Sequence, residues 1–144
     1  MIRKILLGYD GSRSADNAFN FAVDLARRYS AELHLIAVAR PPEFGDEVET
    51  EAAIEDARHR YDKVLGPLQA RLEREPLKAH VHVAVGHPAE QIVRYAEQHH
   101  IDHIVVGHRG HTLFERWLIG SIARQVIAYA HCAVTVVRAG AAER

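Results

Sequence analysis

Apolar residues follow two alternating patterns along the chain, short runs and spacings of three or four. Five short segments rich in apolar and β-branched residues predict strands at residues 3–9, 32–39, 78–85, 102–106 and 133–138. Four segments with apolar residues three or four apart predict helices at residues 15–29, 54–72, 88–99 and 121–130. Since strands and helices alternate throughout, the pattern predicts an α/β fold with a parallel sheet between two layers of helices.

The boundaries of these elements carry their own signals. Ser14 precedes the first helical stretch and is a candidate N-cap. Residues 43–51 are acidic and poor in apolar side chains, so we expect a mobile loop there. Gly66 and Pro67 interrupt the second helical pattern, but the apolar phase continues beyond them, which predicts a kink and not a break.

The chain is expected to form one domain over residues 1–144. Its length suits a single core, and neither a Pro/Gly/Ser-rich linker nor an internal repeat divides it. A doubly wound sheet binds its ligands beyond the carboxyl ends of the strands, where the strand order reverses. Functional residues are therefore expected directly after strands.

Composition narrows the function classes. Lys and Arg total 18 against 19 Asp and Glu, and this near-neutral balance argues against general binding to nucleic acids or anionic membranes. No apolar stretch is long enough for a signal peptide or a membrane span. Cys132 is the only cysteine, which excludes an internal disulfide and a cysteine-rich zinc module. We therefore expect a cytoplasmic location.

Two glycine clusters lie where a phosphate group could bind. Gly107 and Gly110 follow the fourth strand, and Gly120 with Ser121 begins the fourth helix. Glycines let backbone N–H groups approach a phosphate, and the start of a helix adds N–H donors and the positive end of its dipole. Arg109 can add charge-assisted hydrogen bonds. Each cluster alone could be a tight turn or a plain helix cap; together, after a strand and before a helix, they favour a phosphate site.

The same residues carry a family resemblance. Nucleotide-binding universal stress proteins have a signature that reads glycine, two residues, glycine, nine residues, then glycine followed by serine or threonine. This chain has the same pattern and resembles that family over nearly its whole length. Further likeness lies in the opening ILLGYDGS, in GHPAEQIVRYA from Gly86 and in the final HCAVTVVR, although Ala133 stands where the family usually has proline. The resemblance implies a five-stranded sheet in the order 3-2-1-4-5.

The resemblance also implies an ATP site. Asp10 would contact the adenine side and Val38 would line the base pocket, although Asp10 could equally be a turn residue and Val38 a core residue. Val106 and Ile122 could offer backbone contacts. The residues expected to hold ribose and phosphates are Gly107, Arg109, Gly110, Gly120 and Ser121. The phosphates would recruit Mg²⁺ or Mn²⁺. The family also implies a homodimer through the last strand, from Val134 to Val137, where an unpaired edge is a liability.

The 11 histidines are unusually many for this length. His80 and His82 alternate along one predicted strand and should share a face. A cluster around a helix end (His99, His100 and His103) has a structural reason in the helix dipole. We predict no metal site from this spacing. His108 and His111 lie in the glycine loop, where solvation at the surface is the simpler interpretation and contact with phosphate or a divalent ion the alternative.

Three functions follow in order of preference. The first is an ATP-binding, nucleotide-dependent sensor or regulator of a stress response with at most slow hydrolysis, because no general base stands beside the glycine loop and no catalytic residue is assigned. The second is an interaction module of the same fold that binds no nucleotide. The third is a nucleotidyl or phosphoryl transferase that uses His108 or His111. A regulatory protein partner is conceivable, but the sequence names none.

Overall fold

The computed structural model describes residues 1–40, 47–108 and 119–139 of the chain. The strands are β1 (Lys4–Gly8), β2 (Glu32–Ala39), β3 (Ala79–Val85), β4 (His103–Gly107) and β5 (Ala133–Val137). The helices are α1 (Arg13–Tyr29), α2 (Glu47–Glu73), α3 (Pro88–Gln98) and α4 (Ser121–Tyr129). The predicted strands and helices are all present, and most boundaries agree within one or two residues.

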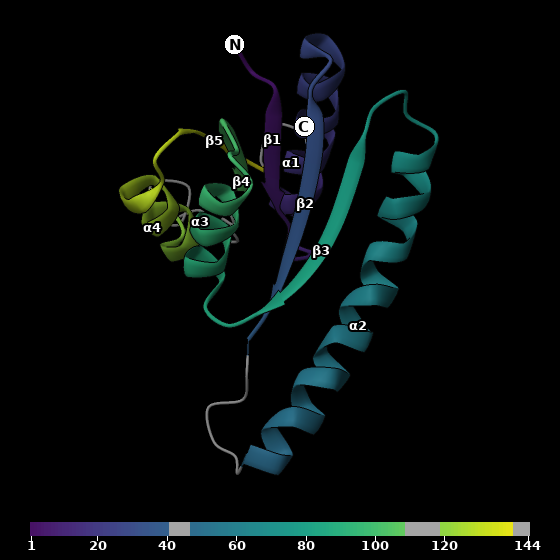
Figure 1. The fold of residues 1–144 in the computed structure, drawn as a ribbon, viewed down its shortest axis with the longest axis vertical. Helices are drawn as coiled ribbons and strands as arrows, with labels where there is room; N and C mark the ends of the chain where they lie inside the picture. Colours follow the sequence, from purple (N-terminus) through teal and green to yellow (C-terminus); the bar gives the residue numbers. More distant parts are fainter. Residues whose placement is uncertain (41–46, 109–118, 140–144) are drawn as a thin grey trace.

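The strands form one sheet in the order β3-β2-β1-β4-β5, and every pair of neighbours is parallel. The chain moves outward from β1 to β3, returns to the other side of β1 with β4, and ends at β5. Because crossovers between parallel strands are right-handed, this reversal places α1 and α2 on one face and α3 and α4 on the other (Figure 1). The predicted strand order is confirmed.

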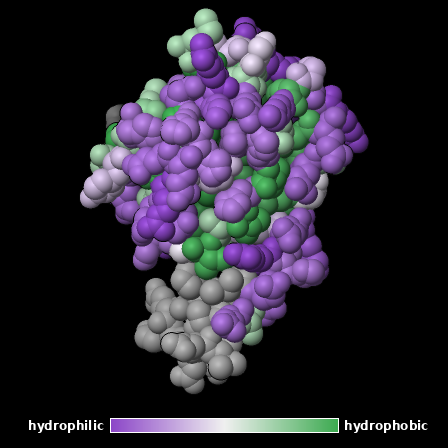
Figure 2. Space-filling model, in the orientation of Figure 1, coloured by the Kyte–Doolittle hydropathy of each residue, from purple (hydrophilic) through white to green (hydrophobic). Residues whose placement is uncertain are grey.

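Each face of the sheet has its own apolar core. Alternate residues of the inner strands point to opposite sides, so Leu33 and Leu35 pack with α1 and α2, whereas Leu6 and Ile36 pack with α3 and α4. The inner strands β1, β2 and β4 are buried on both faces, which explains their nearly continuous apolar sequence. Figure 2 shows apolar side chains gathered in a diagonal band that is bordered by polar residues.

The start of α1 differs from its prediction. The N-cap is Ser12, whose Oγ accepts a hydrogen bond from the Ala15 amide at 3.2 Å. Ser14, the predicted cap, is instead buried inside the first turn. The prediction was two residues late because the apolar periodicity becomes visible only at Ala15, after the helix has begun.

The helix α2 is longer than predicted. It begins at Glu47, so the second half of the expected 43–51 loop is helical, and it continues through Pro67 as one element. Leu65, Leu68 and Leu72 lie on its buried side and hold the helix against the sheet on both sides of the proline. Within the described ranges, no helix is both long and apolar enough to cross a membrane.

Candidate functional site

A cleft of about 640 Å³ opens at the carboxyl edge of the sheet, where the strand order reverses between β1 and β4. Seven of the residues singled out from the sequence line it: Asp10, Val38, Val106, Gly107, Gly120, Ser121 and Ile122. They come from β2, β4, α4 with its N-cap, and the turn after β1. The structure thus brings residues more than a hundred positions apart into one cavity.

The floor of the cleft depends on close contact between β4 and α1. A Cβ on Gly107 would lie 2.6 Å from Ser14 Oγ, 2.7 Å from the Ser14 carbonyl carbon and 2.8 Å from the Ala15 nitrogen. Two of these atoms belong to the backbone and cannot rotate away. Gly107 therefore lets the end of β4 pack directly against the first turn of α1.

The turn after β1 is fixed by three residues in sequence. Asp10 accepts a hydrogen bond from the Ser12 amide through Oδ1 at 2.9 Å, and Gly11 adopts a φ of +81° that strongly favours glycine. Ser12 then caps α1. Asp10 is therefore both a turn residue and part of the cleft lining, so the two interpretations of this residue are compatible.

The N-terminus of α4 opens into the cleft without a side-chain cap. Gly120 occupies the N-cap position and has no side-chain oxygen to cap the helix, and the first turn contains no acidic residue. The first amides of a helix lack partners inside the helix, and those that begin at Ser121 have none among the described residues, so they can serve as donors. The dipole of the helix makes this end favourable for an anion.

Other residues of the cleft were not predicted. Arg40 follows β2, while Arg60, Tyr61 and Val64 come from α2. Since α2 runs antiparallel to the strands, its first half stands over their carboxyl ends. The apolar periodicity of α2 predicts only the side of this helix that packs on the sheet. The signal available was the direction of the helix, since α2 must carry the chain from the end of β2 back to the start of the parallel strand β3.

Two polar residues near the cleft are more buried than expected. His108, predicted as a solvated loop residue, is only 3% exposed, and its amide donates to the Val137 carbonyl at 2.7 Å. Tyr9 is also buried and donates its hydroxyl proton to Asp16 Oδ1 at 2.6 Å. Burial and the Asp16 carboxylate raise the pKa of the Tyr9 hydroxyl, so this side chain stays neutral.

Arg109 and Gly110 from the first glycine cluster, together with His111, lie outside the described residues. The second cluster, Gly120 and Ser121, lies inside them and lines the cleft.

Comparisons with known proteins agree with this architecture. The model of the universal stress protein family matches residues 1–138. The universal stress protein MJ0531 of Methanocaldococcus jannaschii is 34% identical over 145 residues, which cover 96% of this chain and 83% of that protein. The solved structure of UspA from Lactobacillus plantarum has a TM-score of 0.78 and 30% identity, covering 94% of this chain and 97% of that one.

Two more distant structures share the fold and contain nucleotides. A universal stress protein in complex with cAMP has a TM-score of 0.72 and 22% identity, covering 94% of this chain and 96% of that one. An Arabidopsis thaliana family member with AMP bound has a TM-score of 0.74 and 16% identity, covering 98% of this chain and 94% of that one. The match of the family model over residues 1–138, together with a relative that is 34% identical and covered over 83% of its length, shows that this chain belongs to the universal stress protein family.

Proposed function

We propose that this protein binds ATP in the cleft between β1 and β4 and acts as a nucleotide-dependent sensor or regulator in a stress response. The observation that carries the proposal is the N-terminus of α4, which has no side-chain cap from its N-cap residue Gly120 and faces a cleft at the reversal point of the sheet. Bound nucleotides in the cAMP and AMP complexes of the same fold make an adenine nucleotide the ligand class to test.

The phosphates would lie against α4. The amides that follow Gly120 and the Ser121 hydroxyl can donate to phosphate oxygens, while Arg40 and Arg60 add positive charge at the cleft. In this arrangement Gly107 supports the site by allowing α1 and β4 to approach closely. Arg109 and Gly110, which lie outside the described residues, stay predicted members of this phosphate site.

The base would occupy the apolar side of the cleft. Val38 and Val106, at the ends of β2 and β4, line the cleft beside Ile36 and Ile92 and are nearly buried. Apolar walls with a few polar groups are typical of small-molecule sites, because the walls remove the ring from water and the polar groups orient it. Asp10 lies at the same edge and would accept a hydrogen bond from the base or ribose.

The cleft fits a divalent ion that arrives with the nucleotide. Among the described lining residues Asp10 is the one carboxylate, and its Oδ1 already accepts from the Ser12 amide. Mg²⁺ usually binds through one or two carboxylates together with phosphate oxygens and waters. Because Asp10 is assigned to the base or ribose, the phosphates would supply most ligands to Mg²⁺ or Mn²⁺, and the hydroxyl of Ser12 or Ser121 could add one.

This donor set favours binding over turnover. The hydrogen bond from Ser12 holds Asp10 within its turn, so this carboxylate is not poised to take a proton from an attacking water. We therefore propose that any ATP hydrolysis is slow. His108 also lines the cleft, so nucleotidyl or phosphoryl transfer is the competing function. Turnover that is abolished in His108→Ala would support it.

The phosphate position is tested by a matched pair of substitutions at Gly120. Its φ of −56° suits any residue, and both aspartate and asparagine are good N-caps. Gly120→Asp places a negative charge beside the proposed phosphates, whereas Gly120→Asn adds the same volume without the charge. We expect calorimetry to show ATP binding about tenfold weaker in Gly120→Asp than in Gly120→Asn, owing to charge repulsion.

Adenosine is the control ligand for this pair because it has no phosphate. Its affinity should be the same in both variants. Equal ATP affinity in the two folded variants would place the phosphates elsewhere, and a difference that persists with adenosine would point to a general distortion of the cleft.

We also propose that β5 pairs with its counterpart in a second copy of the chain. β5 is an edge strand, and Val134, Val136 and Val137 are only half-buried. Edge strands present unpaired backbone groups, and pairing removes this liability. Light scattering is expected to give about twice the chain mass of 16.2 kDa; a monomer at micromolar concentration would contradict the dimer.

A further inference from the structure

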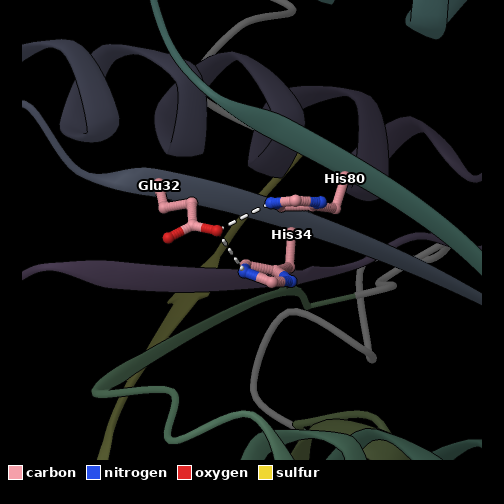
Figure 3. A group of neighbouring side chains, drawn as sticks. All are labelled: Glu32, His34 and His80. Atoms are coloured by element: carbon pink, nitrogen blue, oxygen red, sulfur yellow. Dashed lines mark hydrogen bonds and ion pairs between the residues drawn. The ribbon is translucent and has the colours of Figure 1, made fainter.

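Glu32, His34 and His80 form a compact polar group at the opposite edge of the sheet from the cleft (Figure 3). One ligand atom from each residue lies within 4.8 Å of the others. His80 Nε2 donates to Glu32 Oε1 at 2.7 Å, and His34 Nε2 lies 3.5 Å from the same oxygen. Two imidazole nitrogens therefore converge on one carboxylate oxygen.

The group is a product of strand register. Glu32 and His34 are two residues apart on β2 and point to the same face, and His34 pairs with His80 on β3. Because both strands begin at the amino edge of the sheet, the three side chains gather there, on the side covered by α3. The two histidines are 46 positions apart in the sequence, so their spacing gave no sign of this meeting.

His34 is the buried member of the group, and its Nε2 is an unsatisfied polar atom among the described residues. The side chain is more than nine-tenths buried, and Nε2 has no hydrogen-bond partner among the residues that the structure describes. Burial and the neighbouring His80 lower the pKa of His34 to about 4, although Glu32 opposes this shift, so the ring is neutral at physiological pH. A neutral nitrogen with a lone pair, enclosed beside a carboxylate, is suited to bind a cation.

The other nitrogen of His34 is already oriented. His34 Nδ1 lies 2.6 Å from the Tyr95 hydroxyl of α3. If Nδ1 carries the proton and donates to Tyr95, Nε2 is left with its lone pair directed toward Glu32 and His80. Metal-binding histidines are commonly held in this way, with the second nitrogen donating to an outer partner.

We propose that Glu32, His34 and His80 bind a Zn²⁺ ion. Two imidazoles and a carboxylate form a donor set that Zn²⁺ prefers, and a fourth position would remain for water. Metal binding would replace the proton that now links His80 to Glu32. The ion would join β2 to the edge strand β3 and satisfy His34 Nε2.

Small movements would complete the coordination. Ligands at about 2.0–2.1 Å from a tetrahedral ion are about 3.3 Å apart, close to the present separations of 2.7 and 3.5 Å. The rings of His34 and His80 are stacked at 4.5 Å, so His80 must turn its ring edge toward the ion. Its side chain is 42% exposed and has room to turn, which also gives the ion a route from solvent.

One neighbouring cation opposes binding. Lys78 Nζ lies 3.8 Å from Glu32 Oε1 and would repel the ion, but its side chain is 73% exposed and can move into water. The site is also independent of the nucleotide cleft. None of its three residues lines the cleft, and Ile36, the lining residue on β2 that is nearest in the sequence, is two positions beyond His34, about 7 Å along the strand.

The test is calorimetric titration of ZnCl₂ into tag-free protein that has been freed of metal with a chelator. The intact chain should bind one Zn²⁺ at this site. Loss of a ligand in His80→Ala or Glu32→Gln should weaken this binding by more than about 100-fold, and Tyr95→Phe by about 10–100-fold, the usual cost of an outer partner. His80 and Glu32 are partly exposed, so these two variants should remain folded, as circular dichroism can verify.

The controls are His59→Ala and His131→Ala, which remove exposed histidines elsewhere and should leave the affinity unchanged. Co²⁺ provides a second readout, since a tetrahedral site intensifies its visible absorption, and this signal should vanish in His80→Ala. An intact chain that binds no Zn²⁺, or Zn²⁺ binding that survives both His80→Ala and Glu32→Gln, would overturn the proposal.

Discussion

Replacing Gly107 with alanine is expected to lower the free energy of unfolding by about 3 kcal/mol or more, at the upper end of the cost of overpacking. The new methyl group would meet the backbone of Ser14 and Ala15 at 2.7 and 2.8 Å, so α1 and β4 must move apart. For a chain of this length the melting temperature should fall by about 10 °C. Thermal unfolding followed by circular dichroism gives the measurement.

Gly66→Ala is the matched control for this substitution. Gly66 lies within α2, and, apart from its chain neighbours and the backbone of its own helix, a Cβ there would meet no described atom within 4 Å. Alanine favours the helix by up to about 1 kcal/mol, while its position before Pro67 opposes this gain. We expect a change of less than about 1 kcal/mol. If the two alanine variants had the same melting temperature, the conclusion that Gly107 packs closely against α1 would be contradicted.

Acid is expected to destabilise the metal-free protein by about 2–3 kcal/mol through His34 alone. Its pKa is about 4 in the folded chain and near 6.5 when unfolded, chiefly because of burial. As the pH falls below about 6.5, His34 becomes protonated in the unfolded chain but not in the folded chain. Stability is therefore lost between about pH 6.5 and 4, and the loss from this residue ends once the folded chain also protonates. The charged or titratable groups that face the ring are Glu32 on β2, His80 on β3, Lys4 on β1, and Tyr95 and His99 on or beside α3.

Urea unfolding at a series of pH values, with chelator present, measures this effect. His34→Asn removes the titrating ring, so its stability should fall less between pH 6.5 and 4 than that of the intact chain. His82 and His103 also have pKa values lowered by burial, and they account for part of the slope that remains. An NMR titration that places the folded pKa of His34 above 6 would refute the mechanism.

Local pattern was sufficient to predict the order of elements and, with the family resemblance, the topology. Strand and helix signals are repeated several times within each segment, so single exceptions such as Pro67 do not hide them. The ends of helices depend on one or two residues. The pattern therefore predicts an N-cap at Ser14 where the structure has Ser12, and it does not indicate that α2 begins at Glu47.

Contacts between distant segments could not be obtained in this way. The residues that follow strands, such as Asp10 and Gly120, were accessible because every parallel strand ends at the same edge. Arg60 reaches the cleft only because of the direction of α2. The meeting of His34 with His80 depends on the register between β2 and β3, and a shift of one residue would place His80 on the opposite face.

The position of the cleft also bears on when it can form. It lies across β1 and β4, which pair although Ile5 and His103 are 98 positions apart. Such a pair closes a very long loop, whose entropic cost must be met before the contact stabilises anything. The cavity therefore exists only in chains in which β1 and β4 have paired. A ligand held there binds the folded chain and not the unfolded one, so it would raise the free energy of unfolding.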